Sequence, residues 1–189
     1  MTKKFPAFIS LLLLVLTLIS LSSHASSLTL NAPAQVYFSP NGGTTQAIIK
    51  EISDARSEIL VQAYSFTSSP IAKALVDANK RGVKVEAILD KSQKKDSYTE
   101  ATFLSNMKIP TYIDSKHAIA HNKIMVIDKT TVITGSFNFT KAAEEKNAEN
   151  LLIIKSKDLA KTYIDNWEQH REHSEDYQRK QTVSAKKKP

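Results

Sequence analysis

The sequence predicts an α/β fold in which a mixed, mainly parallel central β-sheet is flanked by helices. Two observations support this class. Nearly continuous apolar runs, such as "EILVQAYSF" (58–66) and "VKVEAILD" (83–90), have the length of strands and alternate with segments of helical periodicity. Strands that are buried on both faces and joined by helices are typical of a parallel sheet covered by helices.

The first strand and the first helix follow a polar lead. The run "AQVYFSP" (34–40) predicts a short strand that Pro40 ends. Apolar residues at helical spacing then predict a helix over 45–55. The strand 58–66 follows this helix, so the chain begins with a β-α-β order.

The second helix has boundary signals at both ends. Ser69 and Pro70 suit its N-cap and first helical position, and Gly82 suits its C-terminal end. The strand 83–90 comes directly after it, which extends the alternation to β-α-β-α-β.

The second half of the chain predicts further elements of both kinds. After a polar loop at 90–98, we expect a helix at 98–107 and a strand at 109–114. Two apolar arms, 124–128 and 131–135, then predict a β-hairpin.

The last predicted elements are a strand and a long helix. The polar segment 141–150 leads to the apolar strand 151–155, and a final helix runs from Asp158. One face of this helix should lie on the sheet, and its apolar residues are Leu159, Tyr163, Ile164 and Trp167.

Residues 1–25 predict a secretory signal peptide rather than part of the fold. Lys3 and Lys4 precede a long apolar run, and the small residues Ser23 and Ala25 follow it at the positions that a signal peptidase recognises. The alternative is a membrane anchor, because the run is nearly long enough to span a bilayer. Cleavage predicts a periplasmic or secreted protein without a stable membrane span.

The remainder predicts one domain at 26–180 and a basic, disordered tail at 181–189. The chain has no cysteine, which excludes thiolate catalysis and thiolate metal sites. Its formal charge of +7 favours an anionic partner, such as nucleic acid or the phosphate surface of a membrane.

The predicted hairpin carries polar residues among its apolar ones. His121 and Lys123 are two residues apart, and so are Ser136 and Asn138, so each pair points to one face of its strand. If the arms pair, an imidazole, an ammonium, a hydroxyl and an amide converge. This set suits a phosphate diester, because preorganised donors stabilise the negative charge of a pentacoordinate transition state.

The same residues suggest a mechanism. His121 can attack phosphorus as a neutral imidazole and form a phosphohistidine. Glu149 is a candidate to hold the other ring nitrogen of His121 and fix its tautomer. We expect no cofactor and no catalytic metal, because the sequence shows no cluster of carboxylates or thiolates for one.

The spacing of these residues resembles the HKD motif of the phospholipase D superfamily. The pattern is His-x-Lys-x4-Asp from His121 to Asp128, followed by a Gly-Ser-x-Asn that ends at Asn138 and by the later Glu149. A short exported chain with one motif is similar to the bacterial periplasmic nuclease branch, which includes plasmid-borne endonucleases that work without a metal. The resemblance implies a phospholipase D-like α/β/α sandwich.

The resemblance also implies a role for each matching residue. His121 would be nucleophile or acid, and Lys123 and Asn138 would be phosphate ligands. Ser136 would help to position the site and Glu149 would orient the histidine. Asp128 would be structural.

One motif cannot supply both histidines of an in-line displacement, because nucleophile and proton donor stand on opposite sides of the phosphate. An isologous homodimer solves this problem, and the resemblance implies the same dimer. His117 is a competing candidate for the acid within one chain. His170 and His173 have a spacing that could ligate a metal, but "QHREHSEDYQ" indicates a solvated helical face.

The resulting expectation is a homodimeric, metal-independent endonuclease that cleaves DNA, with RNA as a second substrate, and has little sequence specificity. Two alternatives remain open. The motif equally suits a phospholipid head-group hydrolase, although the basic charge favours nucleic acid. The third reading is a non-catalytic protein that binds nucleic acid on the same basic surface.

Overall fold

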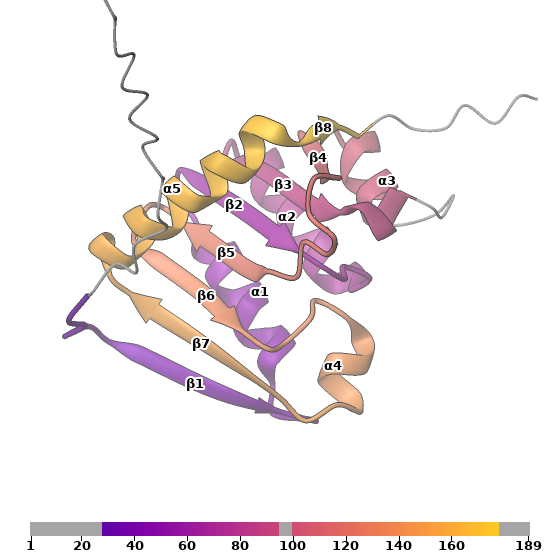
Figure 1. Ribbon diagram of the computed structural model, residues 1–189. Coiled ribbons are helices and arrows are strands. Elements are labelled where there is room, and N and C mark those ends of the chain that lie inside the picture. Colours follow the sequence, from indigo (N-terminus) through magenta and orange to yellow (C-terminus); the bar gives the residue numbers. More distant parts are fainter. Residues whose placement is uncertain (1–27, 95–99, 178–189) are drawn as a thin grey trace, which may run out of the picture.

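An eight-stranded sheet organises the protein in a computed structural model that describes residues 28–94 and 100–177 (Figure 1). The strand order is β1-β7-β6-β5-β2-β3-β4-β8. The strands are β1 (Ala34–Ser39), β2 (Glu58–Ala63), β3 (Lys84–Asp90), β4 (Thr111–Asp114), β5 (Lys123–Ile127), β6 (Thr131–Gly135), β7 (Glu149–Lys155) and β8 (Glu175–Asp176). The helices are α1 (Thr44–Asp54), α2 (Ser69–Lys80), η1 (Lys91–Lys94), α3 (Glu100–Asn106), α4 (Lys141–Glu145) and α5 (Lys157–His173).

The sheet is mixed, as the sequence predicts, but the expectation that it is mainly parallel is wrong. Only β2–β3 and β3–β4 pair in parallel, and the other neighbouring strands pair antiparallel. Helices α2 and α3 make the crossovers that parallel pairing requires, whereas a short turn joins β5 to β6 and a longer connection that contains α4 joins β6 to β7. An apolar run indicates that both faces of a strand are buried. Helices bury both faces of parallel and antiparallel strands alike, so the run does not reveal the pairing direction.

Two cores lie on opposite faces of the sheet. Helices α1, α2 and α3 cover the larger one, and α5 crosses the other face (Figure 1). Trp167 of α5 is buried against the sheet, where its indole Nε1 donates a hydrogen bond to the Val61 carbonyl at 2.9 Å. The predicted apolar face of the last helix is confirmed, because Leu159, Tyr163 and Ile164 pack against the same cluster.

Some boundaries differ from the prediction. The strand predicted to Phe66 ends at Ala63, and Phe66 instead forms an isolated bridge with Phe139. Ser68, not Ser69, is the N-cap of α2, and the Ser69 hydroxyl donates a hydrogen bond to Glu100. The polar segment 141–150 contains α4 and the first residues of β7.

None of the helices in the described part of the chain is long and apolar enough to cross a membrane. The predicted signal peptide at 1–25 and the predicted basic tail at 181–189 lie outside the described residues. Both stay predictions, and so does the periplasmic or secreted location.

Candidate active site

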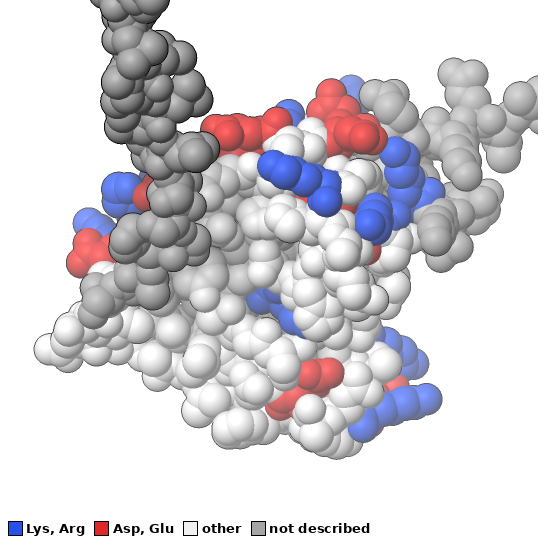
Figure 2. Space-filling view, viewed as in Figure 1, with Lys and Arg blue, Asp and Glu red and all other residues white. Residues whose placement is uncertain are grey.

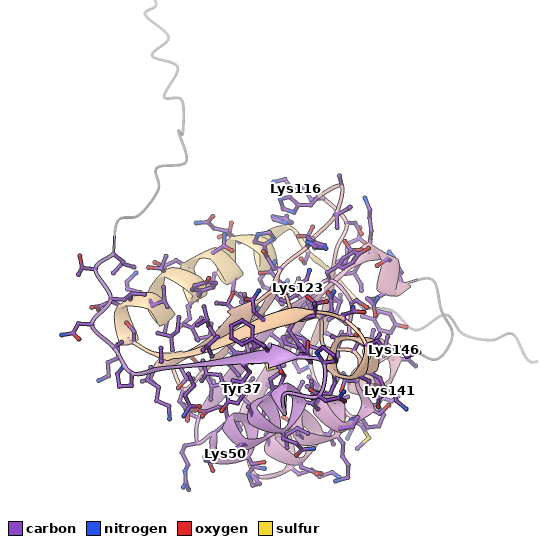
Figure 3. The ribbon with its side chains drawn as sticks, turned by 90° about the horizontal axis from the view of Figure 1, so that it is seen from below. Tyr37, Lys50, Lys116, Lys123, Lys141 and Lys146 are labelled. Carbon is purple, nitrogen blue, oxygen red and sulfur yellow. The ribbon has the colours of Figure 1, made fainter. Side chains whose placement is uncertain are left out.

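Four strand ends meet at one edge of the sheet and bring the predicted residues there. The antiparallel pairing of β2 with β5 sets Lys123 opposite Ala63. The pairing of β6 with β7 sets Gly135 opposite Leu151. The residues just beyond these ends therefore share one edge, and Figure 3 shows Lys123 there beside the ends of the strands.

His121 is exposed and stands next to an aromatic ring. The centroid of its imidazole lies 4.6 Å from that of the Tyr64 ring, and the rings are tilted by 52°. A hydrogen bond of 2.9 Å from the Tyr64 amide to the Asn122 carbonyl joins the two segments. The imidazole is therefore held at the surface, where a large substrate can reach it.

The connection from β4 to β5, residues 115–122, is fastened at several points before it reaches His121. Asp90 accepts a hydrogen bond from the Ala120 amide at 2.8 Å, and the Lys91 ammonium donates to the His117 carbonyl at 2.9 Å. These contacts fix the backbone that carries the imidazole.

Lys123 places a positive charge below this surface. The residue is 6% exposed, and its ammonium donates to the His121 carbonyl at 2.8 Å and lies 5.1 Å from the Tyr64 ring centroid. Burial lowers the pKa of Lys123, and the charge of Glu149 opposes that effect. No carboxylate among the described residues forms an ion pair with this ammonium, so its charge is available to an anion.

Ser136 is held by the first residues of β7. Its hydroxyl oxygen accepts hydrogen bonds from the backbone amide and the side-chain amide of Asn150, at 3.1 and 3.3 Å. Gly135 makes this close approach possible: its φ is +154°, and a Cβ there would lie 2.3 Å from the Asn150 carbonyl oxygen. Asn150 follows Glu149 directly and is not among the site residues that the sequence predicts.

Asn138 lies between Phe137 and Phe139, which are both fully buried. The side-chain oxygen of Asn138 is also buried, and it has no hydrogen-bond partner among the described residues. A buried polar group without a partner is rare in a folded protein and can serve a bound ligand. An amide oxygen accepts hydrogen bonds, so a bound phosphate would take its hydrogen bond from the NH2 group of the same side chain.

Glu149 begins β7 opposite Ser39. Its carboxylate accepts a hydrogen bond from the Asn147 side chain at 3.1 Å, and within the described ranges no hydrogen bond joins it to His121. Its role in orienting that histidine stays a prediction. The interaction that the structure does show is electrostatic, with Lys123.

Asp128 lies at the opposite end of β5, about 17 Å from Lys123 at the usual rise of a strand. Its carboxylate accepts hydrogen bonds from the amides of Arg56, Ser57 and Glu58 at 2.8, 2.7 and 3.1 Å. Asp128 therefore fastens the hairpin turn to the start of β2 and is not among the residues gathered around His121.

The expectation that His170 and His173 lie on a solvated face is wrong. Their imidazoles approach Asp114, at the end of β4, and the exposed His117 joins them from the following connection. Asp114 is 56 residues from His170 in sequence, so local periodicity could not reveal this cluster. The signal in the sequence was the i,i+3 spacing of each pair.

Three comparisons with known proteins agree with this geometry. Residues 48–171 match the family described as cardiolipin synthase, PLD-like domain. A protein named phospholipase D from Rickettsia typhi is 45% identical over 130 residues, which span 69% of this chain but only 64% of that relative. The crystal structure of Nuc, a phospholipase D family member from Salmonella typhimurium, superposes with a TM-score of 0.73 and 38% identity, covering 77% of this chain and 98% of Nuc.

Proposed function

The chain belongs to the phospholipase D superfamily, and from that premise we propose that it is a metal-independent endonuclease that cleaves DNA through a phosphohistidine. One observation carries the proposal. The buried ammonium of Lys123 donates to the backbone carbonyl of His121, the Lys123 ammonium and the exposed His121 imidazole both lie against the Tyr64 ring, and no carboxylate in the described part of the chain forms an ion pair with that ammonium. A nucleophile near a positive charge that no ion pair occupies suits attack on an anionic diester.

The reaction has two displacements. In the first, the neutral imidazole of His121 attacks phosphorus, a P–N bond forms, and the P–O bond to the leaving oxygen breaks as an imidazolium protonates that oxygen. In the second, water attacks the phosphohistidine, gives its proton to the neutralised imidazole and releases His121. Lys123 and Asn138 stabilise the charge on the non-bridging oxygens.

A second copy of the chain supplies the imidazolium. Within one chain, the Nδ1 of His117 lies 2.8 Å from Asp114, and its ring faces His170 with centroids 4.8 Å apart. These contacts engage the His117 side chain with Asp114 and His170, which favours an isologous dimer. In that dimer one phosphate lies between two copies of His121.

Exposed apolar side chains stand on both sides of the candidate site. Phe38 is 65% exposed and pairs with Asn150, the residue that holds Ser136, and Ile119 is 57% exposed two residues before His121. In Figure 2 the described surface over β1 and β7 is largely uncharged. Exposed apolar residues beside a polar patch are typical of a protein interface, which supports a two-fold axis at this edge.

The preference for DNA rests on charge. Lys116 lies on the connection that leads to His121, and Lys141 and Lys146 lie in and directly after α4 on the other side of Lys123 (Figure 3). Spaced lysines around a phosphate site suit a polyanion that continues in both directions. Such contacts bind the backbone and carry no base information, so we expect little sequence specificity.

The second candidate function is hydrolysis of a phospholipid head group. It is favoured by the names of relatives, phospholipase D in Rickettsia typhi and mitochondrial cardiolipin hydrolase in Mus musculus, the latter 26% identical over 121 residues. A lipid diester and a nucleic-acid diester present the same phosphate to the site. Only the groups beyond the phosphate differ.

The test is cleavage of supercoiled plasmid in excess EDTA by the wild type, His121→Ala and Lys123→Met. Lys50→Met is the matched control, because Lys50 is an exposed lysine on α1 that pairs with Asp54. We expect nicking by the wild type and by the control, and none by the other two variants. Hydrolysis of phospholipid vesicles without nicking would replace the nuclease with a lipid hydrolase, and plasmid binding without turnover would indicate a binding protein.

The dimer has a separate test. Phe38→Asp should shift the protein to a monomer in sedimentation and remove its activity, since a charge would be buried at the interface. Leu30→Asp is the control, because Leu30 is 46% exposed and precedes the other end of β1. A Phe38→Asp variant that stays dimeric would move the interface elsewhere.

A further inference from the structure

Four potential metal ligands converge at the end of β4, away from His121. They come from three segments: Asp114 from β4, His117 from the following connection, and His170 and His173 from the last turn of α5. One ligand atom from each residue lies within 4.8 Å of all the others. Helix α5 and strand β4 are thereby joined through side chains that no step of the proposed reaction uses.

The distances are close to those of a tetrahedral site. The Oδ2 atom of Asp114 lies 2.8 Å from Nδ1 of His170, 2.8 Å from Nδ1 of His117 and 3.3 Å from Nε2 of His173. When zinc binds such ligands tetrahedrally at about 2.0–2.1 Å, neighbouring ligand atoms are about 3.3 Å apart. Small side-chain rotations would therefore admit an ion among the four atoms.

Hydrogen bonding alone accounts poorly for this cluster. A carboxylate oxygen offers about two lone pairs, yet three imidazole nitrogens surround Oδ2 of Asp114. The three rings also crowd one another, with centroids 4.8, 5.1 and 5.4 Å apart. As metal ligands, all three imidazoles would face one cation.

The environment suits a bound cation. The Asp114 side chain is completely buried, and its other oxygen accepts hydrogen bonds from the amides of Lys116 and His117 at 3.1 and 3.3 Å. Burial alone would raise the pKa of Asp114, but the hydrogen bonds from the histidines outweigh that effect and hold its pKa below the usual range. His117 is the most exposed member of the cluster, with 44% of its side chain accessible, and leaves a path for an ion.

We propose that Asp114, His117, His170 and His173 bind a zinc ion. Three imidazoles and one carboxylate form the nitrogen and oxygen set that zinc accepts, whereas magnesium and calcium prefer oxygen ligands throughout. Four protein ligands complete the tetrahedron, so the site is a structural one.

The ion stabilises the fold and takes no part in the reaction. Asp114 shares the face of the sheet under α5 with Tyr112, while Lys123 shares the other face with Met125. Three strand spacings, about 14 Å, separate β4 from β5. Bound to His117, the ion also holds the connection 115–122, which carries His121.

The test uses the purified wild type, stripped with chelator and returned to metal-free buffer, with zinc alone as the probe. We expect one zinc per chain by elemental analysis and a rise in Tm of about 5–10 °C at a hundredfold excess over its Kd. His117→Ala and His170→Ala should lose both effects. His121→Ala is the matched control, a histidine outside the cluster, and should keep them.

A second measurement guards against a variant that fails to fold. Cobalt added to the stripped wild type should give the intense visible bands of a tetrahedral site, and folded His117→Ala should lack them. A wild type that binds no zinc, or binding that survives in both cluster variants, would overturn the proposal. Binding that only His121→Ala removes would also overturn it. Because none of these readouts is an activity, they succeed or fail independently of the nuclease.

Discussion

Replacing Asp128 with alanine should lower the stability of the protein and leave the chemistry of each folded molecule unchanged. The Asp128 carboxylate accepts hydrogen bonds from three backbone amides and from the Ser57 hydroxyl, so four interactions are lost at once. All of them lie at the end of β5 opposite Lys123. Asp128 belongs to the family's sequence motif, but in the structure it fastens the hairpin turn to the start of β2.

The expected loss in the free energy of unfolding is about 3–5 kcal/mol. Water can reach Arg56 and Ser57, so each hydrogen bond contributes near the lower end of the usual range, about 0.5–1 kcal/mol. Asp128 also has a φ of +52°, a left-handed conformation that costs alanine about 1 kcal/mol more than aspartate or asparagine. Asparagine also tolerates the left-handed conformation and keeps one acceptor oxygen, so Asp128→Asn should lower the free energy of unfolding by only about 1 kcal/mol.

Urea denaturation of the two variants measures these losses, with Asp165→Ala as the control. Asp165 forms an exposed ion pair with Lys161, so its removal should change little. Hydrogen bonds hold the pKa of Asp128 below its usual value against the effect of burial. A carboxylate with a lowered pKa stabilises the folded state at pH values above its pKa in the unfolded chain, about 3.9. That contribution is lost as the pH falls through the pKa of the folded state. The gap between wild type and Asp128→Ala should therefore narrow below about pH 4, where only the pH-independent part remains.

One outcome would contradict this structural role of Asp128. If Asp128→Ala keeps its urea midpoint and loses phosphodiester cleavage, Asp128 acts on the site and not on the turn.

Three further predictions follow from the site and its supports. Wild type mixed with an equal amount of His121→Ala, after subunit exchange, should show about one quarter of the wild-type activity, since only dimers with both histidines are active; one half would indicate independent chains. Turnover should have a bell-shaped pH profile, because one histidine must be neutral and the other protonated, and a monotonic rise to high pH would contradict this. Gly135→Ala should cost at least about 2 kcal/mol in urea denaturation, because its Cβ meets the Asn150 carbonyl at 2.3 Å. Gly82→Ala, with a φ of +92° and no atom within 4 Å, isolates the conformational part, about 1 kcal/mol.

The order of the main elements could be predicted from the sequence because each depends on local pattern. Helix α5 shows this, since the residues expected to face the sheet do so. Pairing direction could not be predicted, because an apolar run such as β5 looks the same beside a parallel or an antiparallel neighbour. Strand β8, only two residues long, has no periodicity to detect.

In the candidate site, too, the local arrangement could be predicted and the contacts between distant segments could not. The spacing of His121, Lys123, Ser136 and Asn138 predicts their common edge, because a hairpin fixes the relative positions of its own residues. The Asn150 contact and the Asp114 cluster join segments that are distant in sequence. Only the folded chain brings such groups together, and their residue types alone did not reveal them.

The fastened connection before His121 affects how this protein would meet its substrate. Because Asp90 and Lys91 already hold the backbone of 115–122, the entropy of ordering that segment is lost during folding and not during binding. The histidine then has only its two side-chain torsions left to adjust. Reaction rates limited by chemistry should therefore depend little on solvent viscosity, unlike those of enzymes in which a lid must close over the substrate.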